Sequence, residues 1–194
     1  MKYIDLDGNK VIDRGDNRLV DGDMGDQTII GNTTPRYQYT FNGYISWKGL
    51  SLSVMFQGVG KRDWVAGGAY FWGFGPYAQV TVFKEHMDYW RPDNPGAYYP
   101  KPYINSAGGV APYQDKNIQR TDLYLQNAAY CRLKNLTLSY DLPNSWVHKA
   151  GLQKVQVFFS GENLLTFTKL KGMFDPEAIF SSNSYTSYGV KNYP

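Results

Sequence analysis

The chain has 194 residues, a formal net charge of +3 and 16% aromatic residues. Disordered chains are poor in aromatic residues, so this composition predicts a folded protein. The 20 lysines and arginines are scattered, which argues against nucleic acid as a partner. The single cysteine, Cys131, has no second thiol in the chain, so a scaffold stapled by internal disulfides is excluded.

The beginning of the sequence gives no sign of a targeting segment. The first five residues lack the basic and apolar regions of a secretory signal peptide. No run of about 18 apolar residues follows, so we expect no transmembrane helix. The sequence is therefore expected to be either cytoplasmic or a piece of something longer.

Residues 1–35 are rich in Asp, Asn and Gly, which predicts a loop. From Asp5 to Asp16 the loop has oxygen-bearing side chains at the ligand positions of an EF-type calcium loop, with the Val11 carbonyl at the seventh. Lys10 stands where such loops have glycine, and the last ligand is Asp where they have Glu. A loop of Asx turns without a metal is the alternative. The predicted structural Ca²⁺ ligands are Asp5, Asp7, Asn9, Val11, Asp13 and Asp16.

Residues 37–47 and 50–60 alternate apolar and polar side chains on either side of Lys48-Gly49, which predicts a β-hairpin. Neither arm contains a charged side chain. A membrane-spanning β-strand needs about 9–11 residues with one apolar and one polar face, and both arms fit. A long hairpin in a soluble sandwich alternates in the same way, so these two arms leave both folds open.

Residues 61–122 are rich in proline and aromatic residues without sustained alternation, which predicts a long loop. Apolar spacing across 78–90 predicts one short helix, ending before Pro92 and packed against the loop itself. Aromatic rings can stack on sugars, so rings of this loop are candidate substrate contacts. The alternative is that they hold the loop together. The candidates are Trp64, Trp72, Tyr98 and Tyr99.

Strand character returns at 123–125 and again at 130–140, with a bulge expected near Lys134-Asn135. Alternation from Val155 to Glu162 predicts a fourth strand. The connection at 143–151 is typical of a helical turn that ends at a glycine.

The predicted connections alternate between short and long, and the last long one is the aperiodic segment 169–194. Outer-membrane barrels sort their connections in this way, because periplasmic turns are short and extracellular loops are long. We therefore predict an all-β fold, a partial transmembrane β-barrel of about four long antiparallel strands with long extracellular loops. The residues expected to face the lumen are Gln38, Thr40, Asn42, Ser51, Ser53 and Gln57.

Seven sequence blocks occur in a fixed order along the chain. They are DQTIIGN (26–32), PRY (35–37), FQGVGKRDW (56–64), YWRPDNP (89–95), YLQNA (124–128), RLKNLTL (132–138) and SGENLLT (160–166). Together they resemble the C-terminal part of SusC/RagA-type TonB-dependent outer-membrane transporters of Bacteroidetes, over nearly the whole chain.

The resemblance implies a longer protein with a plug domain inside a barrel of about 22 strands. Residues 1–194 would be a C-terminal part of that barrel, with the plug, the TonB box and the last strand absent. The implied function is import of oligosaccharides or similar nutrients across the cell outer membrane, in contact with its lipid. The implied partners are a SusD-like surface lipoprotein, TonB-ExbB-ExbD acting through the missing N-terminal part, and an oligosaccharide or peptide substrate.

No enzyme activity and no required cofactor are expected. Glu85, His86 and Asp88 do not converge on one point of a short helix, so no catalytic residue is predicted. The alternative function is a soluble, secreted β-sandwich that binds carbohydrate and holds calcium in its first loop.

Overall fold

The computed structural model describes residues 3–13, 15, 24–73, 82–102 and 119–179. The chain divides into two compact units. Among the described residues, the strand unit consists of 32–64 and 126–179, and the loop unit of those within 3–31 and 65–125. Among the residues described, no helix is long and apolar enough to cross a membrane.

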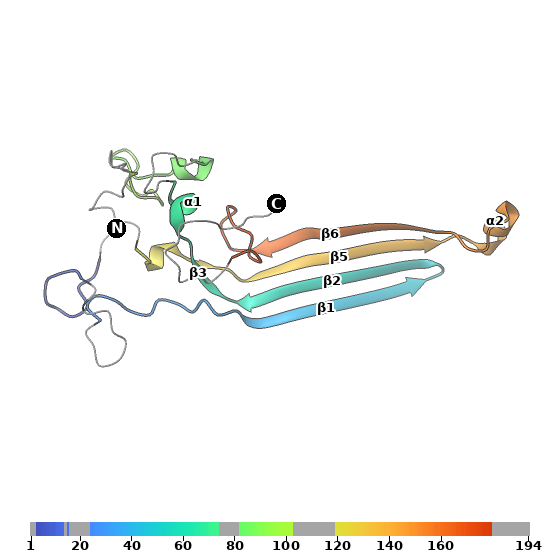
Figure 1. Ribbon diagram of the computed structural model, residues 1–194, viewed down its shortest axis with the longest axis horizontal. Coiled ribbons are helices and arrows are strands. Elements are labelled where there is room, and N and C mark those ends of the chain that lie inside the picture. Colours follow the sequence, from blue (N-terminus) through green and yellow to red (C-terminus); the bar gives the residue numbers. More distant parts are fainter. Residues whose placement is uncertain (1–2, 14, 16–23, 74–81, 103–118, 180–194) are drawn as a thin grey trace. The chain divides into compact units, whose positions relative to one another are not determined.

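Four long strands of the strand unit form one antiparallel sheet in the order β1-β2-β5-β6 (Figure 1). Lys48 and Gly49 join β1 to β2 with positive φ at both residues, as a two-residue turn of type I′ requires. The predicted hairpin is therefore confirmed. The strands span Arg36–Trp47 (β1), Leu50–Lys61 (β2), Tyr130–Asp141 (β5) and Gln156–Thr168 (β6).

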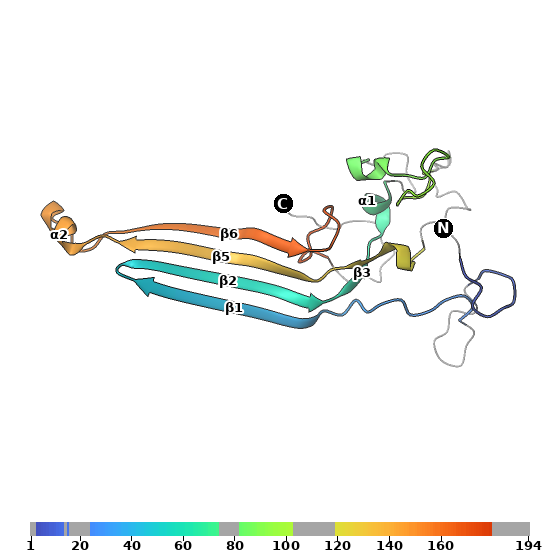
Figure 2. The same ribbon diagram turned by 180° about the vertical axis from the view of Figure 1, so that it is seen from behind.

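One face of this sheet is apolar and remains exposed. The register places Ile45, Leu52, Leu138 and Phe159 in a single row across the four strands. Ile45 and Phe159 are 64% and 62% exposed. Figures 1 and 2 show the strands from both sides, and no described part of this unit packs on their middle stretch. The second sheet that a sandwich needs is therefore not found among the described residues of the unit.

The opposite face is polar. The residues expected to face a lumen share it, because Thr40 pairs with Gln57 in the register of β1 and β2. Hydrogen bonds run across this face, and the Tyr44 hydroxyl donates to Ser51 Oγ at 3.3 Å. On β5 and β6, Thr137 Oγ1 lies 3.1 Å from Ser160 Oγ. The sheet thus has the two-sided pattern predicted for a barrel wall.

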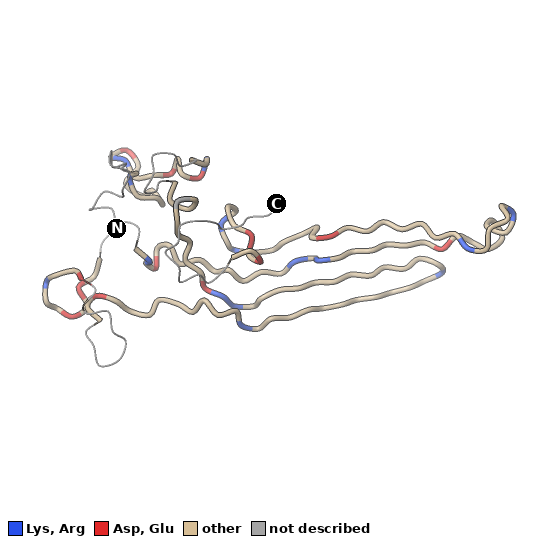
Figure 3. Tube along the Cα trace, in the orientation of Figure 1, with Lys and Arg blue, Asp and Glu red and all other residues tan. Residues whose placement is uncertain are grey.

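In the β1–β2 hairpin the charged residues stand at the ends of the strands, whereas β5 and β6 also carry charged residues within their length, namely Arg132, Lys134 and Glu162 (Figure 3). Arg36 and Lys61 face each other at one end of the β1–β2 hairpin, and Lys48 lies in its turn. The stretch of the hairpin between them has no charged side chain. This arrangement leaves an uncharged band across β1 and β2.

The β5–β6 pair confirms two predictions and extends a third. The register shifts between Leu133 and Asn135, where the bulge was expected. The connection contains α2, Asn144–Val147, and the 3₁₀ helix η4, His148–Ala150, followed by Gly151 at φ 74°. β6 continues to Thr168, well beyond the predicted end at Glu162. Asn163 has a positive φ, which marks an irregularity in the strand, and the pairing with β5 resumes after it.

The middle of the chain corrects two predictions. Residues 123–125 are not one strand: Asp122–Tyr124 is a 3₁₀ helix (η3), and the short strand β4, Leu125–Asn127, pairs with β3, Asp63–Val65. The loop unit also contains the short helix α1, Gly68–Trp72.

The described part of 78–90 holds one 3₁₀ turn, η1 (Lys84–Met87), where a longer helix was predicted. Val80, one of the apolar residues behind that prediction, lies outside the described residues. Met87 and Trp90 are 61% and 42% exposed, so they do not pack against the loop as expected. The turn ends because the Asp88 N–H bonds to the Glu85 carbonyl three residues back and the chain then turns extended.

Candidate functional site

A cluster of aromatic rings forms the core of the loop unit. Phe71 and Tyr124 are its centre, with 0% and 1% of their surface exposed. Trp72 packs edge-on against Tyr124 with ring centroids 4.7 Å apart, and Tyr99 lies 5.4 Å from Phe71. Burial raises the pKa of Tyr99 to about 12 and that of Tyr124 further still. Both phenols therefore stay neutral and packed at ordinary pH.

The four predicted substrate-contacting rings are divided between the two units. Trp72, Tyr98 and Tyr99 belong to the aromatic cluster, and Tyr98 stacks edge-on against Tyr99 at 5.0 Å. Trp64 is in the strand unit, 7% exposed and edge-on to Phe174 at 4.7 Å. This packing favours the alternative that the rings hold their segments together. Contact with substrate stays a prediction.

His86 is the polar centre of the same cluster. Its side chain is buried, and its Nδ1 accepts a hydrogen bond from the Phe83 N–H at 2.9 Å. Its Nε2 lies 3.0 Å from the Phe71 carbonyl, which can only accept, so the ring carries its proton on Nε2. Gly73, at φ 69°, faces the ring so closely that a Cβ there would lie 2.6 Å from His86 Cγ. The imidazole thus joins two segments of the loop unit, 71–73 and 83–86.

Replacing His86 by phenylalanine is expected to loosen this unit. The ring volume is kept, but the Phe83 N–H and the Phe71 carbonyl lose their partner, at roughly 1 kcal/mol for each group. Hydrogen exchange of the 82–99 peptides in the full-length protein measures the opening. His148→Phe, at an exposed position of the α2 connection, is the matched control. Equal protection in the two variants would show that the imidazole bonds contribute nothing.

The acidic loop brings together only some of the predicted metal ligands. One carboxylate oxygen each of Asp5, Asp7 and Asp26 lie within 4.8 Å of one another. Asp26 had not been predicted, because it is far from the motif in sequence. It joins the loop by accepting hydrogen bonds from the Leu6 N–H at 2.6 Å and the Asp13 N–H at 3.0 Å.

The other predicted ligands take part in local turns. Asn9 Oδ1 accepts the Val11 N–H at 2.6 Å, and Asp13 Oδ1 accepts the Gly15 N–H at 2.7 Å. These are the Asx turns of the alternative interpretation. Asp16 lies outside the described residues.

The pKa values of Asp5 and Asp7 are shifted in opposite directions. The hydrogen bond from the Lys10 N–H is the main reason that the pKa of Asp5 lies below its ordinary value. The Asn9 N–H lowers the pKa of Asp7, but lost hydration and the neighbouring Asp5 and Asp26 outweigh it, so this pKa is raised. Carboxylates that raise one another's pKa gain when a cation enters between them.

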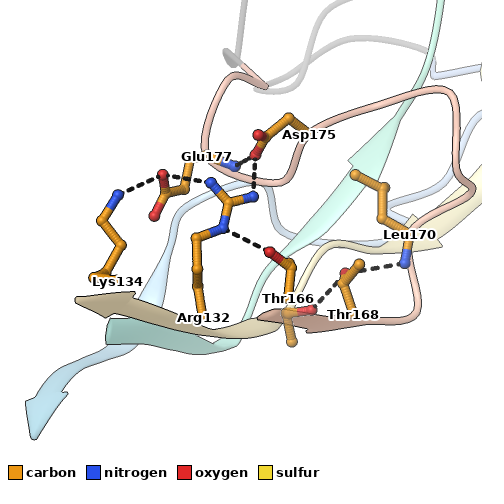
Figure 4. Close-up of polar contacts among 8 residues, drawn as sticks. Arg132, Lys134, Thr166, Thr168, Leu170, Asp175 and Glu177 are labelled. Carbon is orange, nitrogen blue, oxygen red and sulfur yellow. Dashed lines mark hydrogen bonds and ion pairs between the residues drawn. The ribbon is translucent and has the colours of Figure 1, made fainter. Parts of the chain in front are cut away.

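The residues 169–179, named the strap here, fold back onto the end of β5 and β6 (Figure 4). Arg132, with 9% of its side chain exposed, donates to Asp175 Oδ1 and to Glu177 Oε2, both at 2.8 Å. Its Nε donates to Thr166 Oγ1 on β6 at 2.8 Å. Lys134 adds a second cation to Glu177 at 3.0 Å. One guanidinium thereby ties two strands to the strap.

A second arginine and an aromatic pair hold the other parts of the strap. Arg62 Nη2 donates to the Ile179 carbonyl at 3.0 Å, and its Nε donates to the Thr33 carbonyl at 3.2 Å. Burial lowers the pKa of Arg62 below its ordinary value. The ring of Phe174 packs on Trp64, as described above, and Ile179 is also buried. The strap is therefore a packed element, although its sequence has no periodicity.

These features define a class of protein. A four-stranded antiparallel sheet with one exposed apolar face, one hydrogen-bonded polar face and an uncharged band across β1 and β2 is a wall segment of a transmembrane β-barrel. The predicted fold class is confirmed, and the sheet formed by the described residues is not closed.

Comparison with known proteins identifies the relatives. No family model matches the chain. The TonB-dependent receptor P3 of Formosa agariphila is 32% identical over 182 residues, which cover 94% of this chain and 16% of the receptor. The TonB-dependent receptor P26 of the same organism is 26% identical over 178 residues, 91% of this chain and 16% of the receptor. The chain thus spans about a sixth of the length of these curated relatives.

Solved structures agree with the sequence relatives. A structure of the RagAB peptide transporter is 34% identical with a TM-score of 0.55, over 77% of this chain and 16% of that one. The RagAB peptide importer in its open-open state is 29% identical with a TM-score of 0.52, over 83% and 17%. The chain is homologous to TonB-dependent receptors, which confirms the resemblance found in the motifs. The relatives are receptors and a transporter, and none of them is an enzyme.

Proposed function

We propose that the chain forms part of the barrel wall of an outer-membrane TonB-dependent importer of oligosaccharides or similar nutrients. The observation that carries this proposal is the exposed apolar face of the four long strands. Phe41, Phe159 and Phe167 on this face are all more than 60% exposed. A soluble protein rarely exposes so large an apolar patch, because it promotes aggregation. Lipid contact removes that cost and leaves the polar face toward a lumen.

The homologues support the transport role and bear on the substrate. The RagAB structures are those of a peptide transporter, so a peptide is the main competitor of an oligosaccharide as the imported molecule. The SusC/RagA resemblance further supports a SusD-like surface lipoprotein as partner and TonB-ExbB-ExbD as the source of energy. Both partnerships belong to the full-length protein.

Cell fractionation with an antibody against this chain tests location, and uptake by a deletion strain tests substrate. We expect an outer-membrane band far above the 22.1 kDa of the chain. We also expect the deletion strain to lose uptake of a labelled oligosaccharide mixture, with a peptide mixture as the parallel assay. A soluble band near the mass of the chain, together with normal uptake of both mixtures, would contradict the proposal and favour the secreted binding module.

We propose in addition that the acidic loop holds a structural Ca²⁺ between Asp5, Asp7 and Asp26. Calorimetric titration of the full-length protein with Ca²⁺ is expected to give binding in the weak range of extracellular modules, about 10⁻⁴–10⁻³ M. Asp5→Asn should weaken it at least several-fold, because it removes charge from a site built on carboxylates. Asp93→Asn, in the separate 89–95 segment, is the control. No heat of binding in the unmodified protein would contradict the proposal.

A further inference from the structure

The end of the sheet that carries the two short connections is aromatic and basic. Trp47, Leu50, Tyr140 and Val157 form the last row of the apolar face, in register across all four strands. Each of them is at least 42% exposed. The row therefore ends the apolar face with large side chains, two of which have a polar edge.

Beyond this row the α2 connection exposes further apolar side chains. Trp146 is 66% and Leu152 52% exposed, whereas Val147 between them is 3% exposed. The short helix therefore buries one apolar residue and leaves its tryptophan outside. An exposed tryptophan next to a membrane-facing sheet is typical of the headgroup level of a bilayer, where an indole has both an apolar and a polar surrounding.

The charges at this end are mostly positive. Residues 44–52 and 138–158 contain Lys48, Lys149 and Lys154 but a single carboxylate, Asp141. Lys154 lies 3.3 Å from Asp141, which neutralises it in part. Lys48 Nζ lies 4.9 Å from the centre of the Trp47 ring, so its charge is held at the level of the aromatic row. Figure 3 shows blue segments, which mark Lys and Arg, at the turn end of the strands.

We propose that this end is a binding surface for anionic phospholipid headgroups, with Lys48 and Lys149 facing the phosphates and Trp146 anchored beside them. This inference rests on the proposed function, because it requires the sheet to cross a bilayer. Charge complementarity selects the occupant: lysines outnumber carboxylates here, and the apolar face leads directly to them. A lysine near an anionic lipid surface contributes about 1 kcal/mol, which corresponds to about five-fold in affinity.

Native mass spectrometry of the full-length protein in neutral detergent tests the proposal. The protein is titrated with phosphatidylglycerol and, in parallel, with zwitterionic phosphatidylcholine. We expect a preference for phosphatidylglycerol that falls about 25-fold in the double variant Lys48→Gln/Lys149→Gln, at about five-fold for each lysine. Lys61→Gln, at the opposite end of the same hairpin, is the control and should change the preference little.

Three results would overturn the proposal. They are equal binding of both lipids by the unmodified protein, an equal loss in the Lys61→Gln control, and a loss caused by Trp146→Ala with no dependence on the lysines. The last would indicate that this end binds lipid through its apolar side chains and not through its lysines. A protein that stays soluble without detergent would contradict the proposed function itself, so the two failures are distinguishable. Heat-modifiable migration on gels checks that each variant is folded.

Discussion

Replacing Val54 by arginine is expected to reduce the free energy of unfolding of the full-length protein by about 2–4 kcal/mol. Val54 lies in the middle of β2 on the apolar face, between Gly43 of β1 and Leu136 of β5 in the register. An arginine there has to bring its charge to the centre of the bilayer. Urea titration of the protein folded into lipid vesicles, followed by heat-modifiable migration, measures the change.

Ser53→Arg is the matched control for this prediction. Ser53 is the preceding residue of the same strand and points to the opposite, polar face, where it pairs with Tyr44. A charge on the lumen side stays in water, so the expected change is below about 1 kcal/mol. Equal destabilisation by the two variants would mean that the apolar face does not contact lipid.

Replacing Arg132 by methionine is expected to detach the strap and to cost about 3 kcal/mol. Removing one partner of a buried ion pair leaves uncompensated charge behind, which costs about 3–5 kcal/mol. The lower end applies because Asp175 and Glu177 keep 32% and 26% of their side chains exposed. Trypsin reports the detachment directly, since Lys169 and Lys171 lie within the strap.

The triple variant Arg132→Met/Asp175→Asn/Glu177→Gln separates charge from packing. It removes the unpaired carboxylates, so most of the lost stability and the resistance to trypsin should return. Cleavage as fast as in the single variant would show that the guanidinium acts through packing alone.

Lowering the pH is expected to weaken the attachment of the strap, as the Arg132 substitution does. Burial raises the pKa of Asp175, but the hydrogen bonds from Arg132 and the Glu177 N–H together with the nearby positive charges outweigh it, so this pKa is lowered. A carboxyl with a lowered pKa stabilises the fold above its unfolded pKa and loses this contribution as the pH falls through the folded value.

The strands could be predicted where one physical pattern determines them. β1 and β2 alternate over most of their length, because one face meets apolar surroundings and the other a polar one, and both strands were found. β6 was predicted only as far as Glu162, since Gly161 and Asn163 interrupt the alternation although pairing with β5 continues. The pairing of β3 with β4 had no local signal, because three-residue strands are too short to show a period.

The contacts of the candidate sites could be predicted far less well. Arg132 lies in a recognisable strand, but its partners Asp175 and Glu177 lie in an aperiodic segment, and nothing local indicates that they meet. Asp26 likewise could not be predicted as a neighbour of Asp5 and Asp7. It meets them only because the loop folds back, and its distance from them in the sequence gives no indication of this. The aromatic residues of 61–122 indicated a folded loop, and several of those in its described part are packed together, but composition alone does not distinguish a buried ring from an exposed one.

The order of the strands has a consequence for how the sheet assembles. β1 and β2 are joined by two residues, whereas pairing β2 with β5 brings residues 50–59 to 130–140 across the whole intervening loop. Loop closure costs about 0.6 kcal/mol for each doubling of length, and contacts distant in sequence form slowly. The β1–β2 and β5–β6 hairpins should therefore form early, and the pairing of β2 with β5, named the seam here, should be the slow step.

Fluorescence-detected refolding of the seam variants Leu52→Ala and Leu138→Ala, compared with Phe41→Ala in the first hairpin, measures this order. A larger slowing by the Phe41→Ala variant would contradict it. In the cell, such a seam is the point at which an assembly machinery has the most time to act on the chain.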